Sequence, residues 1–169
     1  ERASNLFIYG TVYAVLISLT VSVAGAEFPF LPRHLTLVRA LSVGIPGVFL
    51  ALAPDHRRSR PGFLPRVVRF AVPAGLTAGT ASLIVYFTAL AAQGSNLTES
   101  RTSATVTLLG VGLAILIRLT GSLPSWRWAL IAAMGVGVVL ALTLPFTQTF
   151  FDLEYPPQSV WQVMLVVVI

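Results

Sequence analysis

The 169-residue sequence has no cysteine and no lysine, and it is poor in charge of either sign. The absence of cysteine excludes a disulfide framework, a thiolate metal site and a thiol nucleophile. Charged residues make up only 10% of the chain, against about 25% in soluble globular domains, whereas hydrophobic residues make up 56%. This balance excludes an ordinary soluble domain and predicts an integral membrane protein.

Carboxylates are also missing from every long apolar run, because all six acidic residues lie at or between the ends of these runs. Proton pumps and cation carriers usually keep an acidic residue inside the membrane, so only neutral oxygens remain as ligands here. His34 and His56 lie at opposite ends of the second run and cannot share a metal. There is no glycine-rich phosphate loop and no Ser-His-Asp arrangement, so the sequence assigns neither catalytic residues nor a metal site.

Long apolar runs dominate what is present, and about 20 helical residues suffice to cross the hydrocarbon core of a bilayer. The sequence therefore predicts an all-α, polytopic transmembrane helix bundle with five full spans and a truncated sixth. The expected spans cover residues 5–26, 35–53, 67–93, 102–119 and 126–150, with the short sixth at 158–169. In the third span, Gly75-x-x-x-Gly79 has the spacing that lets two helix backbones approach closely.

The basic residues are all arginines, and most of them lie at span ends. The net charge of +5 invites a nucleic-acid interpretation, but this distribution instead predicts helix anchoring and contact with lipid headgroups. The most basic connection, residues 54–66, falls on the cytoplasmic side under the positive-inside rule. We therefore expect a multi-pass protein of the plasma (inner) membrane whose N-terminal end is cytoplasmic.

The second span is weakest at its centre, where Gly44 and Pro46 lie. Pro46 has no N–H to offer to the Ser42 carbonyl four residues earlier. Unpaired backbone at membrane depth costs several kcal/mol against lipid, so it is tolerated only where it faces protein, water or an ion. The break therefore predicts a site built from neutral oxygens, to which the Tyr13 phenol would also contribute.

Hydroxyls recur on the first span with helical spacing, at Thr11, Ser18 and Ser22. This stripe would face other helices; the alternative is that the hydroxyls bond their own backbone or join helices without functional consequence. Arg39 lies about one turn inside the second span, so it needs a partner or a wet cavity unless it snorkels to the near interface. The resulting ion-pathway candidates are Thr11, Tyr13, Ser18, Arg39, Ser42, Gly44 and Pro46.

The opening Glu1-Arg2-x-x-Asn5-Leu6-Phe7, together with LPRHLTLVRALSVGIPGVFLALAPDHRRSRPGFLPRVVRFAVPAG from residue 31, resembles a known family. It is similar to the carboxy-terminal membrane half of a P-type cation-transporting ATPase, in the calcium-pump-like branch found in actinobacteria. In that family the fifth and sixth membrane helices form such a hairpin, the sixth is broken at Gly-x-Pro, and four more helices follow. The resemblance implies ATP-driven transport of Ca²⁺ or another divalent cation, with this chain forming part of the ion pathway.

The resemblance also carries ligand positions onto this chain. The calcium pumps' fifth-helix ligands, usually Asn and Glu, fall on Thr11 and Ala14, and their sixth-helix ligands, usually Asn, Thr and Asp, fall on Arg39, Ser42 and Val43. Only hydroxyls remain as ligands, and Arg39 would act as a built-in countercharge. The family's DKTG, TGE and GDGxND motifs are not in this chain, so the resemblance assigns ATP and Mg²⁺ to the full-length protein and leaves the enzymatic status of this chain open.

Three regions follow from these expectations: residues 1–53 as an ion-path hairpin, residues 54–66 as a basic cytoplasmic loop, and residues 67–169 as supporting helices. Both ends of the chain look cut, so the expected partners are the lipid bilayer, the remaining cytoplasmic and membrane domains of the same polypeptide, and the transported cation, without nucleic acid. The alternative is a non-catalytic membrane scaffold or interaction module, either a degenerate pump fragment or a subunit of a larger complex.

Overall fold

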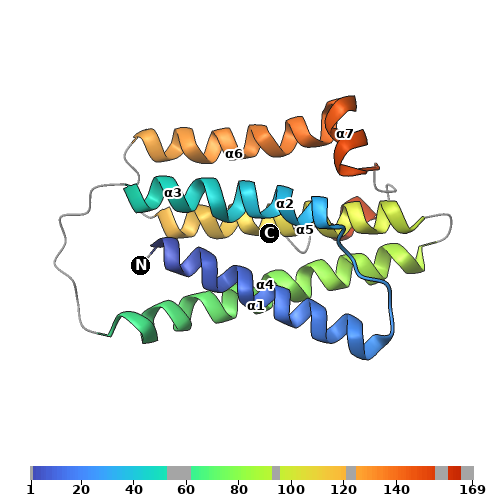
Figure 1. Cartoon of the computed structure of the whole chain (residues 1–169), viewed down its shortest axis with the longest axis horizontal. Helices are drawn as coiled ribbons and strands as arrows, with labels where there is room; N and C mark the ends of the chain where they lie inside the picture. The colour runs from blue at the N-terminus through green and yellow to red at the C-terminus, as the bar shows by residue number, and fades with distance from the viewer. Residues whose placement is uncertain (1, 53–61, 93–95, 121–124, 155–159, 165–169) are drawn as a thin grey trace.

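A computed structural model of the chain describes residues 2–52, 62–92, 96–120, 125–154 and 160–164 (Figure 1). The described residues form a bundle of helices and contain no strand, which confirms the expected all-α fold. The elements are α1 (Arg2–Ala24), α2 (Pro32–Arg39), the π-helical turn η1 (Ala40–Gly44), α3 (Ile45–Leu52), α4 (Phe63–Ala91), α5 (Leu97–Thr120), α6 (Ser125–Thr143) and α7 (Pro145–Phe151).

Three of the described helices are long and apolar enough to cross a membrane, and they correspond to the first, third and fourth expected spans. They are Ser4–Ala24 within α1, Phe63–Ala91, which is α4, and Leu97–Leu119 within α5. The expected fifth span, residues 126–150, is divided: Trp128–Thr143 and Pro145–Phe151 form a fourth candidate that is bent by 84°. The bend follows from Pro145, because the residue before a proline is disfavoured in the α conformation and Leu144 is extended.

The expected second span is present as α2, η1 and α3, which follow one another without a gap. The break expected at its centre takes the form of a π-helical turn, in which the Ile45 N–H bonds to the Ala40 carbonyl five residues earlier. This turn immediately precedes Pro46, which has no N–H to continue the α-helical pattern. Three unbroken helices and one bent pair are thus long and apolar enough to cross a membrane, and the α2–α3 segment, which the π-helical turn divides, lies where the second span is expected.

The α1 helix crosses α4 at close range (Figure 1), and two glycines make this approach possible. A Cβ atom added at Gly75 would lie 2.5 Å from the Val12 Cβ, and one added at Gly79 would lie 2.8 Å from the Leu16 Cδ2. A side chain at either position would therefore overlap α1. As predicted, the Gly75-x-x-x-Gly79 spacing allows the backbones of α1 and α4 to approach closely.

The α1 helix also packs antiparallel to the segment from α2 to α3, as expected for a helical hairpin. Near one end a Cβ at Gly47 would lie 3.8 Å from the Phe7 ring, and further along a Cβ at Gly10 would lie 3.8 Å from the Val43 Cγ2. This register places the π-helical turn η1 beside the N-terminal half of α1.

Two expected segments lie partly outside the described residues. Residues 54–61 of the basic connection are not described, and its last residues already belong to α4, which begins at Phe63 after Gly62 with a positive φ of 78°. Of the short sixth segment, residues 160–164 are described and helical. Its Val160 and Met164 pack against Val85 and Ala89 of α4.

Candidate functional site

One face of α1 carries three polar side chains into the bundle: Asn5, Tyr9 and Tyr13. They recur every four residues, so they lie on one side of the helix. Asn5 is 7% exposed, Tyr9 is fully buried and Tyr13 is 2% exposed. The two phenol rings meet edge to face with centroids 5.1 Å apart. This face, and not the Thr11 and Ser18 stripe, directs the polar atoms of α1 inward.

The π-helical turn places Ser42 opposite this face, and a glycine of α5 makes room for it. Ser42 is 3% exposed. A Cβ at Gly112 would lie 2.7 Å from the Ser42 Oγ and 3.2 Å from the Tyr9 hydroxyl oxygen, so the two hydroxyls converge on the space above this glycine. Three elements, α1, η1 and α5, thus build one neutral polar cluster, which consists of Asn5, Tyr9, Tyr13, Ser42 and Gly112.

Two oxygens of this neutral polar cluster have no partner among the described residues. The Asn5 Oδ1 and the Tyr9 hydroxyl oxygen are both buried and form no hydrogen bond there. Buried polar atoms are almost always hydrogen-bonded, and an unsatisfied one destabilises the fold. These two oxygens are therefore the points at which a water molecule or an ion would gain most from binding.

The structure separates the seven sequence-derived candidates into two groups. Thr11 and Ser18 are exposed, and the Thr11 hydroxyl donates to the Phe7 carbonyl of its own helix at 3.2 Å. The expectation that their stripe would face other helices is therefore wrong for the helices of this chain. A threonine hydroxyl that bonds the carbonyl four residues earlier already has its hydrogen-bond partner within its own helix. Thr11 therefore agrees with the alternative prediction, in which these hydroxyls bond the backbone of their own helix.

The other candidates lie at or beside the helix break. Tyr13 and Ser42 belong to the neutral polar cluster. Pro46 is buried and is the second residue of α3, directly after the π-helical turn and Ile45. Gly44 ends the π-helical turn, where an added Cβ would lie 3.3 Å from the Arg39 carbonyl oxygen. The Arg39 side chain is exposed in this chain, and its guanidinium interacts with the Tyr13 hydroxyl.

Three members of the neutral polar cluster were not among the candidates derived from the sequence: Asn5, Tyr9 and Gly112. The four-residue spacing of Asn5, Tyr9 and Tyr13 is a signal for the first two, because it puts amphipathic side chains on one helical face. Nothing in the sequence singles out Gly112, since its importance depends on which turn of α5 lies opposite η1.

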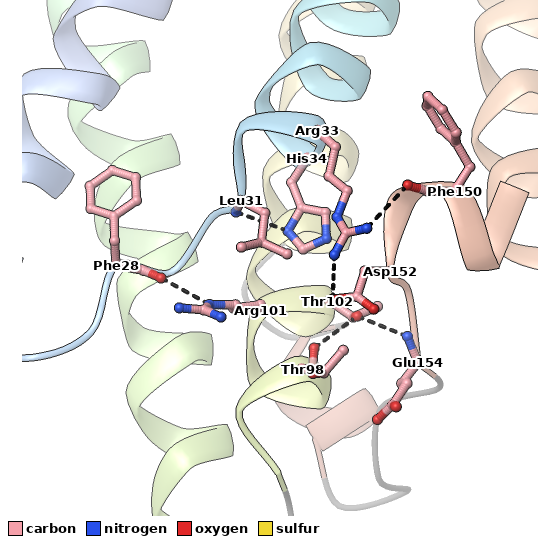
Figure 2. A network of polar contacts seen from close by, with 10 residues as sticks. All are labelled: Phe28, Leu31, Arg33, His34, Thr98, Arg101, Thr102, Phe150, Asp152 and Glu154. Atoms are coloured by element: carbon pink, nitrogen blue, oxygen red, sulfur yellow. Dashed lines mark hydrogen bonds and ion pairs between the residues drawn. The ribbon is translucent and has the colours of Figure 1, made fainter.

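A second polar network ties together the opposite end of the bundle (Figure 2). The Arg33 guanidinium forms an ion pair with the Asp152 carboxylate at 2.7 Å and donates to the Phe150 carbonyl at 3.4 Å. The Arg101 side chain pairs with the Glu27 carboxylate and donates to the Phe28 carbonyl, both at 3.1 Å. Two arginines thus join the connection between α1 and α2, the start of α5 and the end of α7.

The α5 end of the same network is built around Asn96, which caps the helix. The Asn96 Oδ1 accepts from the Glu99 N–H at 2.8 Å, and the Glu99 carboxylate accepts from the Asn96 N–H at 3.2 Å. Asn96 also donates to the Glu154 carboxylate at 2.8 Å, while the Glu154 N–H donates to the Thr102 hydroxyl at 3.0 Å. The cap therefore also fixes the chain that follows α7.

His34 lies inside this second network, just before the expected second span, and is fully buried. Its Nδ1 accepts from the Leu31 N–H at 3.3 Å, which requires an unprotonated Nδ1. Burial lowers the pKa of His34. Nearby carbonyls of Phe151 and Asp152 oppose this change in pKa, although the Nε2 does not reach hydrogen-bond geometry with them. The histidine is therefore neutral near pH 7.

The donor atoms of the neutral polar cluster are hydroxyl and amide oxygens, without a carboxylate. Hard cations accept such ligands, but tight Ca²⁺ sites normally include carboxylates. Across the described parts of the chain, no group of three or more His, Cys, Asp or Glu side chains could hold a metal ion. The hydroxyl and amide oxygens of the neutral polar cluster can by themselves bind a cation only weakly, and the positive charge of Arg39 lies beside them.

No protein-family model and no solved structure matches the chain significantly. Among curated proteins, the calcium-transporting ATPase CtpE of Mycolicibacterium smegmatis is 34% identical over 178 aligned positions, which cover 98% of this chain and 22% of that protein. The calcium-transporting ATPase CtpE of Mycobacterium bovis is 35% identical over 167 positions, which cover 91% of this chain and 21% of that protein. The chain thus spans about a fifth of the length of the curated relatives it matches. With similarity to these ATPases along nearly its whole length and a bundle of apolar helices, the chain is homologous to one membrane segment of calcium-transporting P-type ATPases.

Proposed function

We propose that this chain is the membrane-embedded part of an ATP-driven cation transporter and that α1, η1 and α5 line part of its ion pathway. The observation that carries the proposal is the position of Ser42. Its hydroxyl sits on a π-helical turn, is buried, and converges with the Tyr9 hydroxyl on the space above Gly112. Single-turn π-helical segments occur frequently at functional sites.

The proposed cargo is Ca²⁺ or another divalent cation, by analogy with the calcium-transporting relatives. The neutral polar cluster would provide a stretch of weak oxygen ligands in which a cation is not retained tightly. Arg39 reinforces this property, because a positive charge near the cluster opposes the binding of another cation. ATP and Mg²⁺ would be bound by parts of the full-length protein outside this chain.

The distribution of charge supports the proposed orientation in the plasma membrane. Arg66 and Arg69 lie in the first turns of α4, and Arg118 lies in the last turn of α5, so these cations gather at one end of the bundle. The opposite end carries Glu27 and Asp152, each paired with an arginine. Under the positive-inside rule the first end is cytoplasmic, and the N-terminus of α1 lies with it (Figure 1).

The test is the ion dependence of ATP hydrolysis by the full-length protein in lipid, with Ca²⁺, Mg²⁺, Mn²⁺, Zn²⁺, K⁺ and Na⁺ added in turn. We expect one divalent cation to stimulate hydrolysis, and we expect Ser42→Ala to raise its half-maximal concentration several-fold. Thr80→Val is the matched control, because the Thr80 hydroxyl is exposed on α4 and bonds only its own helix. An unchanged half-maximal concentration in Ser42→Ala would contradict the proposal.

A second candidate function is a non-catalytic membrane scaffold or interaction module. It is favoured by the absence, among the described residues, of any acidic or histidine cluster able to hold a metal. The same hydrolysis assay separates the two candidates. If no ion stimulates ATP hydrolysis and Ser42→Ala behaves like the parent protein, the scaffold is the better explanation.

A further inference from the structure

The short helix α7 leaves the direction of α6 at a sharp bend (Figure 1). Trp128–Thr143 and Pro145–Phe151 qualify together as one candidate span, but the two parts meet at an angle of 84°. Transmembrane helices are tilted by about 20° on average from the bilayer normal. If α6 crosses the membrane with such a tilt, α7 lies within about 30° of the membrane plane.

Side chains of α7 provide hydrogen-bond partners for the backbone at this bend. Pro145 has no N–H to offer to the Ala141 carbonyl four residues earlier. The Thr147 Oγ1 lies 3.1 Å from that carbonyl oxygen, and the Gln148 side-chain amide donates to the Leu142 carbonyl. Backbone groups without a partner are not tolerated against lipid, so a bend that satisfies these carbonyls internally is suited to contact with hydrocarbon.

The C-terminal end of α7 is held by charged residues (Figure 2). The Arg33 guanidinium donates to the Phe150 carbonyl at 3.4 Å and pairs with the Asp152 carboxylate at 2.7 Å. Both side chains of this ion pair are partly exposed, whereas the Phe150 ring points away from them. Because a charge in the hydrocarbon core is costly, this ion pair marks the level of the lipid headgroups.

The outer side of α7 is aromatic and uncovered. Phe146 is 81% exposed and Phe150 is 59% exposed, and their rings stack one helical turn apart with centroids separated by 6.4 Å. The same side of the chain is already apolar and exposed along α6 and at the bend, at Val136, Val139, Leu140 and Leu144. The opposite side of α6 packs into the bundle through the buried residues Leu130, Ile131 and Met134. The phenylalanine pair thus continues the outward face of a candidate membrane span.

We propose that α7 is an interfacial helix that lies in the membrane plane and inserts Phe146 and Phe150 among the lipid acyl chains, at the end of the bundle that carries Arg33 and Asp152. The lipid is the occupant because the pair is continuous with the exposed apolar face of α6. Helices of this kind bury one apolar face about 5–10 Å into the boundary between headgroups and acyl chains. With the orientation proposed above, this is the outer leaflet. The insertion depends neither on the transported ion nor on whether transport occurs.

The test is the accessibility of nitroxide spin labels, which the absence of cysteine from this chain makes practicable. Phe146→Cys and Phe150→Cys are labelled separately in the full-length protein, from which any other cysteine has been removed, and reconstituted in phosphatidylcholine vesicles. Oxygen concentrates in hydrocarbon, whereas nickel ethylenediaminediacetate stays in water. We expect both labels to collide with oxygen several-fold more often than with the nickel complex. Since four helical residues span about 6 Å, the two labels should lie within about 3 Å of the same depth.

Two positions in this chain calibrate the measurement. Val136→Cys, about eight residues before the bend on the exposed face of α6, should report a greater depth in the hydrocarbon. Glu27→Cys replaces a side chain that is 68% exposed at the charged end of the bundle, and its label should favour the nickel complex.

Three results would overturn the proposal. A preference of both α7 labels for the nickel complex would place the helix in water. Low accessibility to both reagents would show that another protein segment covers it. Depths that differ by about 6 Å would show that α7 continues across the membrane instead of lying in its plane.

A second variant keeps an aromatic side chain in place, in case the labels disturb the phenylalanine pair. In Phe146→Trp, the fluorescence added to that of the parent protein should be quenched by lipids brominated on their acyl chains. Added fluorescence that these lipids leave unquenched would also contradict the insertion.

Discussion

The Gly112→Ala variant tests the neutral polar cluster at its tightest point. The new Cβ would lie 2.7 Å from the Ser42 Oγ, 2.9 Å from the Ser42 Cβ and 3.2 Å from the Tyr9 hydroxyl oxygen. Carbon contacts are most favourable at about 3.5–4.0 Å, so α5 must move away from η1 or Ser42 must leave its position. Overpacking of this kind costs about 1–3 kcal/mol, against about 0.5–1 kcal/mol gained when alanine replaces glycine in a helix. We expect a net destabilisation of up to about 2.5 kcal/mol.

The assay is thermal unfolding of the full-length protein in lipid nanodiscs, combined with the cation concentration that gives half-maximal ATP hydrolysis. Gly135→Ala on α6 is the matched control, because a Cβ there would lie 3.9 Å from the Leu113 Cδ2 in ordinary contact. We expect the control to be as stable as the parent protein or slightly more stable, with unchanged cation dependence. If Gly112→Ala matched Gly135→Ala in both measurements, the assignment of the cluster would be refuted.

Three further predictions concern other parts of the bundle. Gly75→Leu should destabilise the protein by at least about 1–3 kcal/mol in thermal unfolding, because its side chain would overlap α1, whereas Leu76→Ala at an exposed neighbouring position should have a much smaller effect. The pKa of His34 is lowered from 6.5 in the folded state, so the unfolded state binds the proton first and the free energy of unfolding should fall as pH drops below about 6.5. In His34→Gln the free energy of unfolding should depend less on pH between about pH 7 and 5. If this pH dependence were the same in His34→Gln as in the parent protein, His34 would be excluded as its source. Because the Arg33 and Asp152 side chains are 40% and 45% exposed, a double-mutant cycle across their ion pair should give at most about 1 kcal/mol, and a larger coupling would contradict the solvent screening expected there.

How far the sequence predicts this fold is shown by its glycines and prolines. Gly75 and Gly79 predict a close helix crossing, because two helix backbones can touch only where side chains are missing. In the structure α1 packs against both glycines. Pro46 predicts the break in the second span, and in the structure this break is a π-helical turn. Pro145 is a signal of the same kind, but the predicted fifth span, residues 126–150, continues across it, whereas the structure bends there by 84°.

The candidate site was harder to predict from the sequence, for a physical reason. A membrane helix is apolar on every face, so the spacing of hydroxyls such as Thr11 and Ser18 shows that they share a face without showing whether that face points inward. In this chain the inward face is that of Asn5 and Tyr9. Gly112 matters only because α5 and η1 meet there, and such a register between distant segments is not encoded in local sequence.

The most direct test of the proposed pathway is Ca²⁺ uptake into liposomes by the full-length protein and its Pro46→Ala variant. The alanine N–H would allow an α-helical bond to the Ser42 carbonyl and so remove the reason for the π-helical turn. The account predicts ATP-driven uptake by the parent protein and a clear loss of uptake rate in Pro46→Ala, with equal amounts of both proteins in the membrane. Uptake at the parent rate by Pro46→Ala, or no ATP-driven uptake of Ca²⁺ or any other divalent cation by the parent protein, would contradict it.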